Sequence, residues 1–301
     1  MPRLFLTWFA EPEDPHYWEY FRVDGIVVSL KSLLLMPKWK FNRALSQGFR
    51  KQFNYDGPLI IDSMLTNIHK PRRTNVEIPQ SFVMYSQYLL GSDLLVQRDY
   101  PLIGVSDPAV RNKLYHKNLM MAEAALKYGE SLGKEVMLVA QGWDLDTYVK
   151  SAEYYRNLGA KYIGIGSLVP HRSDIEFLVK VVKGIREAAG KVYLHLFGVT
   201  GLESLPQISK YIDSVDVSTP AIAASKKELI VIRGETVTRV KTTTVTGMKT
   251  IAELMETTND SLERKFLEDI FSARRLRDKN LSTMIYNAYA LLKFWNARVN
   301  T

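Results

Sequence analysis

The sequence predicts an α/β protein built as a (β/α)8 barrel with a C-terminal helical extension, and three observations support this. Eight short apolar segments rich in β-branched residues alternate with helix-like segments over residues 3–219. Such alternation implies parallel strands joined by right-handed crossovers, and a count of eight favours a closed barrel over an open doubly wound sheet. No GxGxxG or GxxxxGK[ST] motif follows the first segment, which counts against a dinucleotide or nucleoside-triphosphate fold.

The elements of the barrel are expected in chain order. The predicted strands are 3–9, 25–30, 58–62, 93–99, 135–142, 162–167, 191–198 and 214–219. The clearest predicted helices are 107–132, 144–158 and 173–189. Their ends carry the expected starting and stopping residues, which are Asp107-Pro108, Ser173-Asp174, Gly159 and Gly190.

The pattern changes after residue 225, so we expect a barrel domain over 1–225 and an extension over 226–301. Residues 228–241 read as a hairpin that turns at Gly234-Glu235, and 249–298 read as two or three amphipathic helices. One of the residues 259–261 is expected to cap the second helix, and a further break is expected near 278–280. The apolar residues expected to be packed in a core or against a partner are Phe266, Ile270, Leu276, Ile285, Leu291, Leu292 and Trp295.

The composition narrows the protein class and the chemistry. Of 301 residues, 46% are hydrophobic and 24% are charged, which is typical of a globular protein with a sizeable core. No apolar run reaches the roughly 20 residues needed to cross a bilayer, and the start lacks a basic leader, so we expect a cytoplasmic protein without a membrane partner. There is no cysteine, and the five histidines show no metal-binding spacing. We therefore expect no metal and no cofactor.

The charge distribution indicates a nucleic-acid partner. The formal net charge is +8, and basic residues cluster at 70–73, 224–228, 239–244 and 272–279. A solvated basic surface is the alternative interpretation. The candidate nucleic-acid contacts are Arg72, Arg73, Arg172, Lys226, Lys227, Arg274 and Arg275.

Polar residues recur at the ends of the predicted strands. The ends of predicted strands three to eight carry, in order, Asp62-Ser63, Asp99, Gln141-Gly142, Gly166-Ser167, 195–198, and the pair Asp213 and Asp216. In a (β/α)8 barrel the carboxyl ends of the strands hold the active site. One carboxylate there can attack a sugar C1′, a second can transfer protons, and a third can accept two parallel N–H bonds from a guanine-like edge.

Five stretches resemble the tRNA-guanine transglycosylase family, in its order and spacing. They are "LLGSDLLVQRDYP" (89–101), "VAQGWDLDTYVKSA" (139–152), "YIGIGSLVP" (162–170), "YLHLFG" (193–198) and "YIDSVDVSTPA" (211–221). In addition, "LIIDSMLTN" (59–67) resembles the family strand that ends in Asp-Ser-Gly-Gly-Phe. The similarity spans roughly residues 58–222 and is closest to the archaeal branch and to relatives that insert deazaguanine into DNA.

The resemblance implies a reaction and a set of roles. The family exchanges a guanine in nucleic acid for a 7-deazaguanine such as preQ0 without cleaving the strand. Asp216 would be the nucleophile and Asp62 the general acid and base. Asp99 and Gln141 would hold the base, completed by the Gly166-Ser167 backbone and, as a weaker candidate, Ser63. The acceptor implied first is tRNA, with DNA as the alternative, and the sequence leaves room for a homodimer.

The sequence also departs from the family pattern. Met64-Leu65 replaces the glycine pair, the cysteine-rich zinc site is missing, and no room remains for the RNA-binding modules of the archaeal enzymes. Two other classes therefore stay open: a nucleic-acid-binding subunit without catalysis, and an unrelated barrel hydrolase with a phosphate nest at 164–170 and 195–201. We expect His195 to be a hydrogen-bonded core residue and Trp143 to pack on a helix, with stacking on a base as the alternative.

Overall fold

The barrel predicted from the sequence is confirmed. The computed structural model describes residues 2–63, 78–171, 173–198, 205–234 and 236–299. Eight parallel strands form a closed barrel in the order β1 to β8, which is the TIM-barrel arrangement. The chain divides into two compact units, a barrel unit made of Pro2–Glu11 and Asp24–Asp216, and a C-terminal unit that contains Pro12–Val23 and the chain from Val217 onward.

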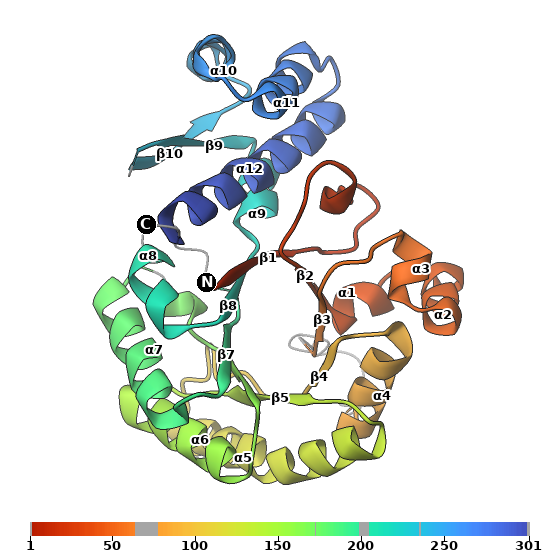
Figure 1. Ribbon diagram of the computed structural model, residues 1–301, viewed down its shortest axis with the longest axis vertical. Helices are drawn as coiled ribbons and strands as arrows, with labels where there is room; N and C mark the ends of the chain where they lie inside the picture. The colour runs from red at the N-terminus through yellow and green to blue at the C-terminus, as the bar shows by residue number, and fades with distance from the viewer. Residues whose placement is uncertain (1, 64–77, 172, 199–204, 235, 300–301) are drawn as a thin grey trace. The chain divides into compact units, whose positions relative to one another are not determined.

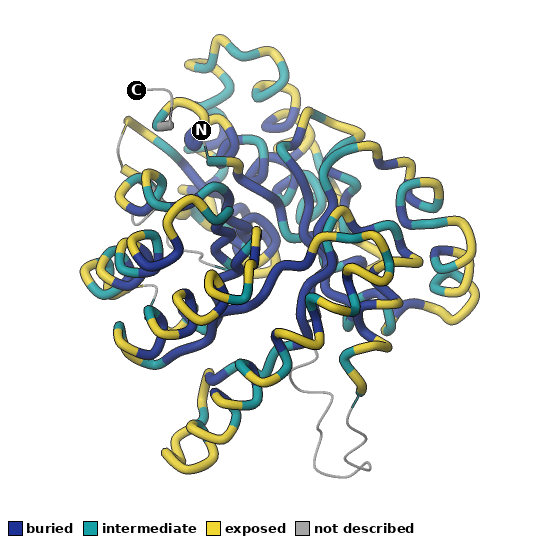
Figure 2. The backbone as a smooth tube through the Cα atoms, turned by 60° about the horizontal axis from the view of Figure 1, so that its bottom comes forward, coloured by how far each residue is buried: buried dark blue, intermediate teal, exposed yellow. Residues whose placement is uncertain are grey.

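The strands are short and lie where the apolar runs predict them (Figure 1). They are β1 (Arg3–Thr7), β2 (Ile26–Ser29), β3 (Leu59–Asp62), β4 (Leu94–Val96), β5 (Val136–Ala140), β6 (Tyr162–Ile165), β7 (Tyr193–Leu196) and β8 (Ser214–Val217). Nearly every strand residue is buried, because helices cover the outside of the barrel and side chains fill its inside (Figure 2).

The helices of the barrel unit lie outside the ring of strands. They are α1 (Leu30–Leu34), α2 (Lys38–Gln47), α3 (Phe49–Phe53), α4 (Gln80–Leu90), α5 (Pro108–Ser131), α6 (Leu145–Asn157), α7 (Ile175–Ala189) and α8 (Leu205–Ile208). Asp107, Asp144 and Asp174 cap α5, α6 and α7, each accepting a hydrogen bond from a backbone N–H of the first turn. Short 3-10 turns occur at Tyr17–Glu19, Val169–His171 and Ser209–Tyr211.

The interior of the barrel has an apolar layer, made of side chains from one face of each strand. Its buried members are Phe5, Val27, Ile60, Val96, Met137 and Val139, and Leu94, Tyr162 and Phe197 pack against them. Side chains two residues apart on a strand share a face, so the next inward position toward the carboxyl end is Thr7 after Phe5 and Asp62 after Ile60. By the same period Gln141 follows Val139, which places a polar layer directly above the apolar one.

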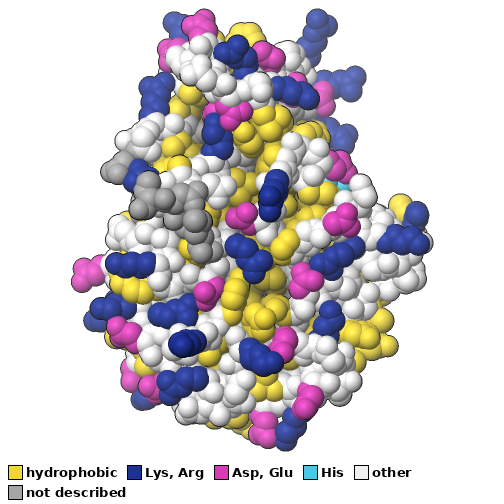
Figure 3. Space-filling model, in the orientation of Figure 1, with side chains coloured by type: hydrophobic (Ala, Val, Ile, Leu, Met, Phe, Trp, Pro, Cys, Tyr) yellow, Lys and Arg dark blue, Asp and Glu magenta, His cyan; other side chains and the backbone are white. Residues whose placement is uncertain are grey.

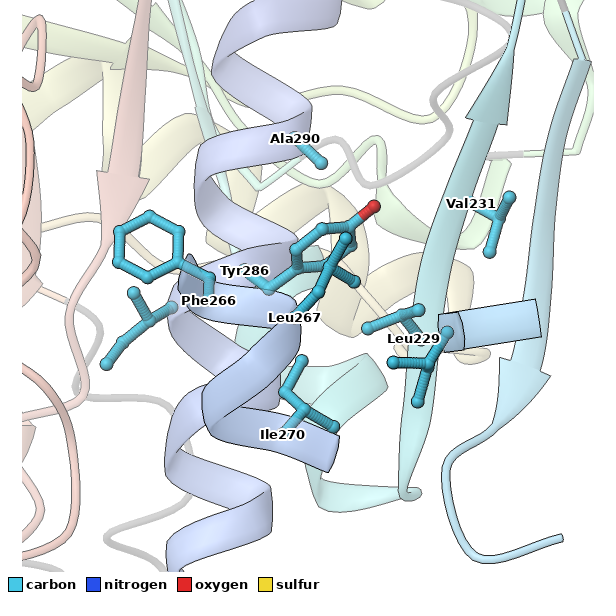
Figure 4. Packing of buried hydrophobic residues seen from close by; sticks show 9 residues of the cluster. Leu229, Val231, Phe266, Leu267, Ile270, Tyr286 and Ala290 are labelled. Carbon is cyan, nitrogen blue, oxygen red and sulfur yellow. The ribbon is translucent and has the colours of Figure 1, made fainter. Parts of the chain in front are cut away.

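The C-terminal unit is a hairpin packed against helices. It contains α9 (Thr219–Ser225), β9 (Glu228–Arg233), β10 (Thr236–Lys241), α10 (Val245–Thr257), α11 (Ser261–Ser272) and α12 (Leu276–Val299). Arg233 pairs with Thr236, so β9 and β10 are neighbouring antiparallel strands separated by two residues, as the sequence predicts. Figure 4 shows its buried cluster, which includes Leu229 and Val231 of β9, Phe266, Leu267 and Ile270 of α11, and Tyr286 of α12.

Three expectations for the chain after residue 212 are corrected. The break expected near 278–280 lies earlier, because α11 ends at Ser272 and α12 begins at Leu276; Asp278 is in the first turn of α12, where a carboxylate favours the helix. Leu276 is 48% exposed, while the other six apolar residues expected to be packed are buried. Asp213 precedes β8, so it lies at the opposite end of that strand from Asp216.

Within the described residues, no helix has both the length and the apolar character that spanning a membrane requires.

Candidate active site

Asp62, Asp99 and Asp216 meet at the carboxyl end of the barrel. Asp62 is the last residue of β3, Asp99 lies three residues beyond β4, and Asp216 is near the end of β8. The charges of Asp216 and Asp99 both act on Asp62, so the three carboxyl groups share one electrostatic environment. Three acids far apart in sequence are thus brought to one place by parallel strands that all point the same way.

Asp99 is held by hydrogen bonds to both of its oxygens. Ser63 Oγ donates to Oδ1 at 2.6 Å, and Gln141 Nε2 donates to Oδ2 at 2.5 Å. Burial raises the pKa of Asp99, while the bonds from Ser63 and Gln141 and the charge of Arg98 oppose that rise. Each oxygen keeps a lone pair for a further donor, so the carboxylate can accept two parallel N–H groups.

Asp216 is also held through both oxygens, by donors from two neighbouring strands. Thr7 Oγ1 donates to Oδ2 at 2.8 Å, and the Gly198 N–H donates to Oδ1 at 2.9 Å. His195 Nε2 lies 3.3 Å from Oδ1, although its direction falls short of a hydrogen bond. Two such donors fix the orientation of this buried carboxyl group.

Asp62 has the opposite environment. It is 8% exposed, and its Oδ1 has no hydrogen-bond partner among the described residues. Burial, followed by the charges of Asp216 and Asp99, raises the pKa of Asp62 well above its ordinary value. The site therefore combines a buried carboxyl group with a raised pKa, Asp62, and a carboxyl group that accepts two hydrogen bonds, Asp216. Different environments of this kind allow two identical groups to take different roles.

His195 is a buried core residue, as the sequence predicts. It is fully buried, its Nδ1 lies 2.7 Å from Ser214 Oγ, and its ring meets the edges of Phe5 and Phe197. Its second nitrogen faces Asp216, so it also forms the floor beneath that carboxylate.

The Gly166-Ser167 segment lies behind Gln141 and is tied to the loop after Asp99. Gly166 N–H donates to Ala140 O at 3.0 Å, and its carbonyl accepts from Tyr148 Oη at 2.8 Å. Ser167 has a positive φ of 60°, and its Oγ accepts from Leu102 N at 3.0 Å, which fastens the loop after Asp99. These hydrogen bonds fix the backbone of Gly166 and Ser167 and the loop that follows Asp99.

If Asp99 binds a base, as the family resemblance implies, replacing Gly166 with alanine is expected to weaken that binding. An added Cβ would lie 3.0 Å from Gln141 Cδ and closer still to Nε2, so the amide would be pushed from Asp99. The loss of that charge-assisted bond predicts an increase of about 10- to 100-fold in the KM for the incoming base. Steady-state kinetics would measure it, and Gln141→Ala should give the same change; an unchanged KM in Gly166→Ala would contradict this role.

Sequence reasoning did not single out Thr7, and it placed Gly198 at a strand end without predicting that both residues donate to Asp216. The signal for Thr7 was present, because it stands two residues after the inward-facing Phe5 on the same strand. Gly198 offered no comparable signal, since any residue except proline supplies a backbone N–H.

The predicted nucleic-acid contacts fall into two groups. Arg72, Arg73 and Arg172 lie outside the described residues. Lys226, Arg274 and Arg275 are exposed and Lys227 is half-buried, all in the C-terminal unit. On the face drawn in Figure 3, lysine and arginine side chains are interspersed with acidic ones over the barrel, so that view shows no single basic patch.

Among the described residues, no group of three or more histidine, aspartate or glutamate side chains is placed to hold a metal ion. The carboxyl groups gathered at this site belong to Asp62, Asp99 and Asp216. Gln141 and Ser63 donate hydrogen bonds to Asp99, and Thr7 donates one to Asp216. No protein-family model and no curated protein matches this chain.

Proposed function

We propose that the protein is a nucleic-acid guanine transglycosylase that exchanges guanine for a 7-deazaguanine. The observation that carries the proposal is the contrast between Asp62 and Asp216 beside a third carboxylate. Asp62 is buried with a raised pKa, Asp216 accepts two hydrogen bonds, and Asp99 offers both oxygens to a ligand. A nucleophile, a proton donor and a base-recognition group are what base exchange requires.

In the first step Asp216 attacks C1′ of the target nucleotide. A bond forms between a carboxylate oxygen and C1′, and the bond from C1′ to N9 of guanine breaks, with its electron pair leaving on the base. Asp62 gives its proton to the departing guanine, which leaves neutral. The product is a covalent ester between Asp216 and the nucleic acid, with the strand intact.

In the second step the incoming deazaguanine reverses this chemistry. Asp62, now ionised, takes the proton from N9 of the new base as N9 attacks C1′. The ester bond breaks, its electron pair returns to Asp216, and Asp62 is protonated again. Two displacements at C1′ retain its configuration, and each role follows from the environment of the group.

Asp99 and Gln141 recognise the hydrogen-bonding edge of the guanine-like base. Among the described side chains, Ser63 donates to one oxygen of Asp99 and Gln141 to the other, which leaves capacity for the N1–H and the exocyclic amine of a guanine-like base. Gln141 Oε1 has no partner among the described residues, so it can accept a further N–H. An adenine presents a different donor pattern on that edge, and a site with unpaired acceptors discriminates strongly against it.

The acceptor is a nucleic acid, which the net charge of +8 favours. The resemblance makes tRNA the first acceptor to test and DNA the second. A base inside a folded acceptor must leave its stack to reach carboxyl groups at the end of a barrel.

The test is incorporation of labelled guanine. The full-length protein is incubated with radiolabelled guanine and, in separate reactions, with unmodified tRNA and with double-stranded DNA. We expect label in one acceptor, displaced on addition of a deazaguanine, with the strand uncut. Release of guanine without incorporation would instead identify a hydrolase, and tight binding without exchange would identify a binding subunit.

A further inference from the structure

Two aromatic rings at the mouth of the barrel each hold a cation from α5. Tyr100 comes directly after Asp99, and Lys117 Nζ lies 4.4 Å from the centre of its ring. Trp143 lies in the loop between β5 and α6, and Arg111 Cζ lies 4.7 Å from the centre of its ring. Cation–π contacts of this kind fix long basic side chains that would otherwise be free to move.

Further contacts hold Tyr100 and Trp143, the two aromatic residues beside these cations, in place. The Asn118 side chain accepts from Tyr100 N at 2.7 Å and donates to Tyr100 O at 3.0 Å, so the residue after Asp99 is held by both backbone groups. Trp143 meets the ring of Tyr115 edge to face at 5.4 Å between centroids. The rings, and with them the cations, are therefore held in place before any ligand arrives.

The first half of α5 carries positive charge without acidic residues. Residues 108–122 contain Arg111, Lys113 and Lys117 and no aspartate or glutamate. Lys113 is exposed. On the neighbouring α6, Asp146 is paired with Lys150 at 2.6 Å, and the Asp144 carboxylate caps its helix. We call Arg111, Lys113 and Lys117, with Tyr100 and Trp143, the α5 rim.

We propose that the α5 rim binds the phosphodiester backbone of the acceptor nucleic acid outside the flipped nucleotide. This inference rests on the proposed function. Asp99 meets the base edge and Asp216 meets C1′, so the sugar and phosphates of the target nucleotide lie toward β8, away from α5. The rim, which lies on the side of β4 and β5, meets phosphates of other nucleotides that cross the mouth. Guanidinium and ammonium groups held beside aromatic rings suit phosphate oxygens.

The experiment measures binding alone, by fluorescence anisotropy of labelled tRNA and of labelled DNA over a series of salt concentrations. The test protein carries Arg111→Gln, Lys113→Gln and Lys117→Gln. A matched control carries Lys127→Gln, Lys161→Gln and Lys183→Gln, which removes the same charge from exposed lysines that pair with acidic residues. Lys113→Glu is a second test variant, because that exposed side chain supports no ring.

The rim variant is expected to lower the slope of log Kd against log salt by about 2 to 3, and the control to leave it nearly unchanged. Lys113→Glu should weaken binding more at low salt than at high salt. Equal slopes in the rim and control variants would overturn the proposal. Binding to anionic lipid vesicles is measured for the same proteins. A rim variant that loses vesicle binding but keeps nucleic-acid binding would also overturn the proposal. Wild-type protein that binds with a steep, rim-dependent slope yet exchanges no guanine would refute the proposed function and leave the rim standing.

Discussion

Replacing Asp216 with alanine is expected to reduce base exchange by on the order of 10⁴-fold or more, because the carboxylate that forms the ester with C1′ is lost. The wild-type protein, trapped on its acceptor with a deazaguanine present, should give a covalent adduct in a denaturing gel. The variant should give none, while its affinity for the acceptor stays within a few-fold of wild type. Mass spectrometry of the digested adduct would locate the sugar on Asp216.

Asp213→Asn is the matched control for this result. Asp213 lies three residues earlier, at the other end of the same strand, where it pairs with Arg186 at 2.6 Å and accepts from Leu194 N at 2.8 Å. Its loss is expected to lower stability by about 1 to 3 kcal/mol while the folded fraction keeps its exchange rate. Full exchange activity in Asp216→Ala would show that the nucleophile is wrongly assigned.

Replacing Asp62 with asparagine is expected to abolish exchange and yet to stabilise the fold at neutral pH. The loss of proton transfer predicts a fall of about 10²- to 10⁴-fold in rate. The gain in stability follows from linkage, because the folded-state pKa of Asp62 is raised above its unfolded value near 3.8. The folded state then binds the proton more tightly than the unfolded state does.

The stability difference between Asp62→Asn and the wild type depends on pH. Below the unfolded pKa both states hold the proton, and the carboxyl group costs the fold nothing. As pH rises from about 4 through the folded pKa, the wild type loses about 1.4 kcal/mol of stability for each pKa unit between the two states. Asparagine does not ionise, so the melting temperature of Asp62→Asn relative to wild type should rise over that window.

Asp260 in the C-terminal unit is a control of opposite sign. Partial burial of Asp260 raises its pKa. Hydrogen bonds from Lys293, the Glu263 N–H and Tyr289, together with the charge of Lys293, outweigh this effect and lower the pKa of Asp260 to about 2. Asp260→Asn should therefore destabilise the fold at pH 7, with the deficit shrinking as pH falls from about 4 to 2. A melting temperature of Asp62→Asn at pH 8 equal to or below that of wild type would contradict the raised pKa.

The closed barrel and the positions of its strand ends could be predicted from the sequence alone. Apolar runs separated by helical segments leave few ways to bury the strands, and parallel strands bring every carboxyl end to one side. For this reason Asp62, Asp99 and Asp216 could be placed together before any contact was known. The helix caps Asp107, Asp174 and Asp260 were also within reach, since capping depends on adjacent residues only.

Only the tertiary structure decided what surrounds each acid. Thr7 and Gly198 reach Asp216 from more than 200 and from 18 residues away in the chain, and the burial of Asp62 depends on side chains from several strands at once. The exposure of Leu276 was likewise invisible to a helical pattern, because periodicity marks an apolar face and not how far a neighbour extends along it. The sequence thus determined which acids come together, whereas close packing between distant segments determined which of them is buried with a raised pKa and which accepts hydrogen bonds.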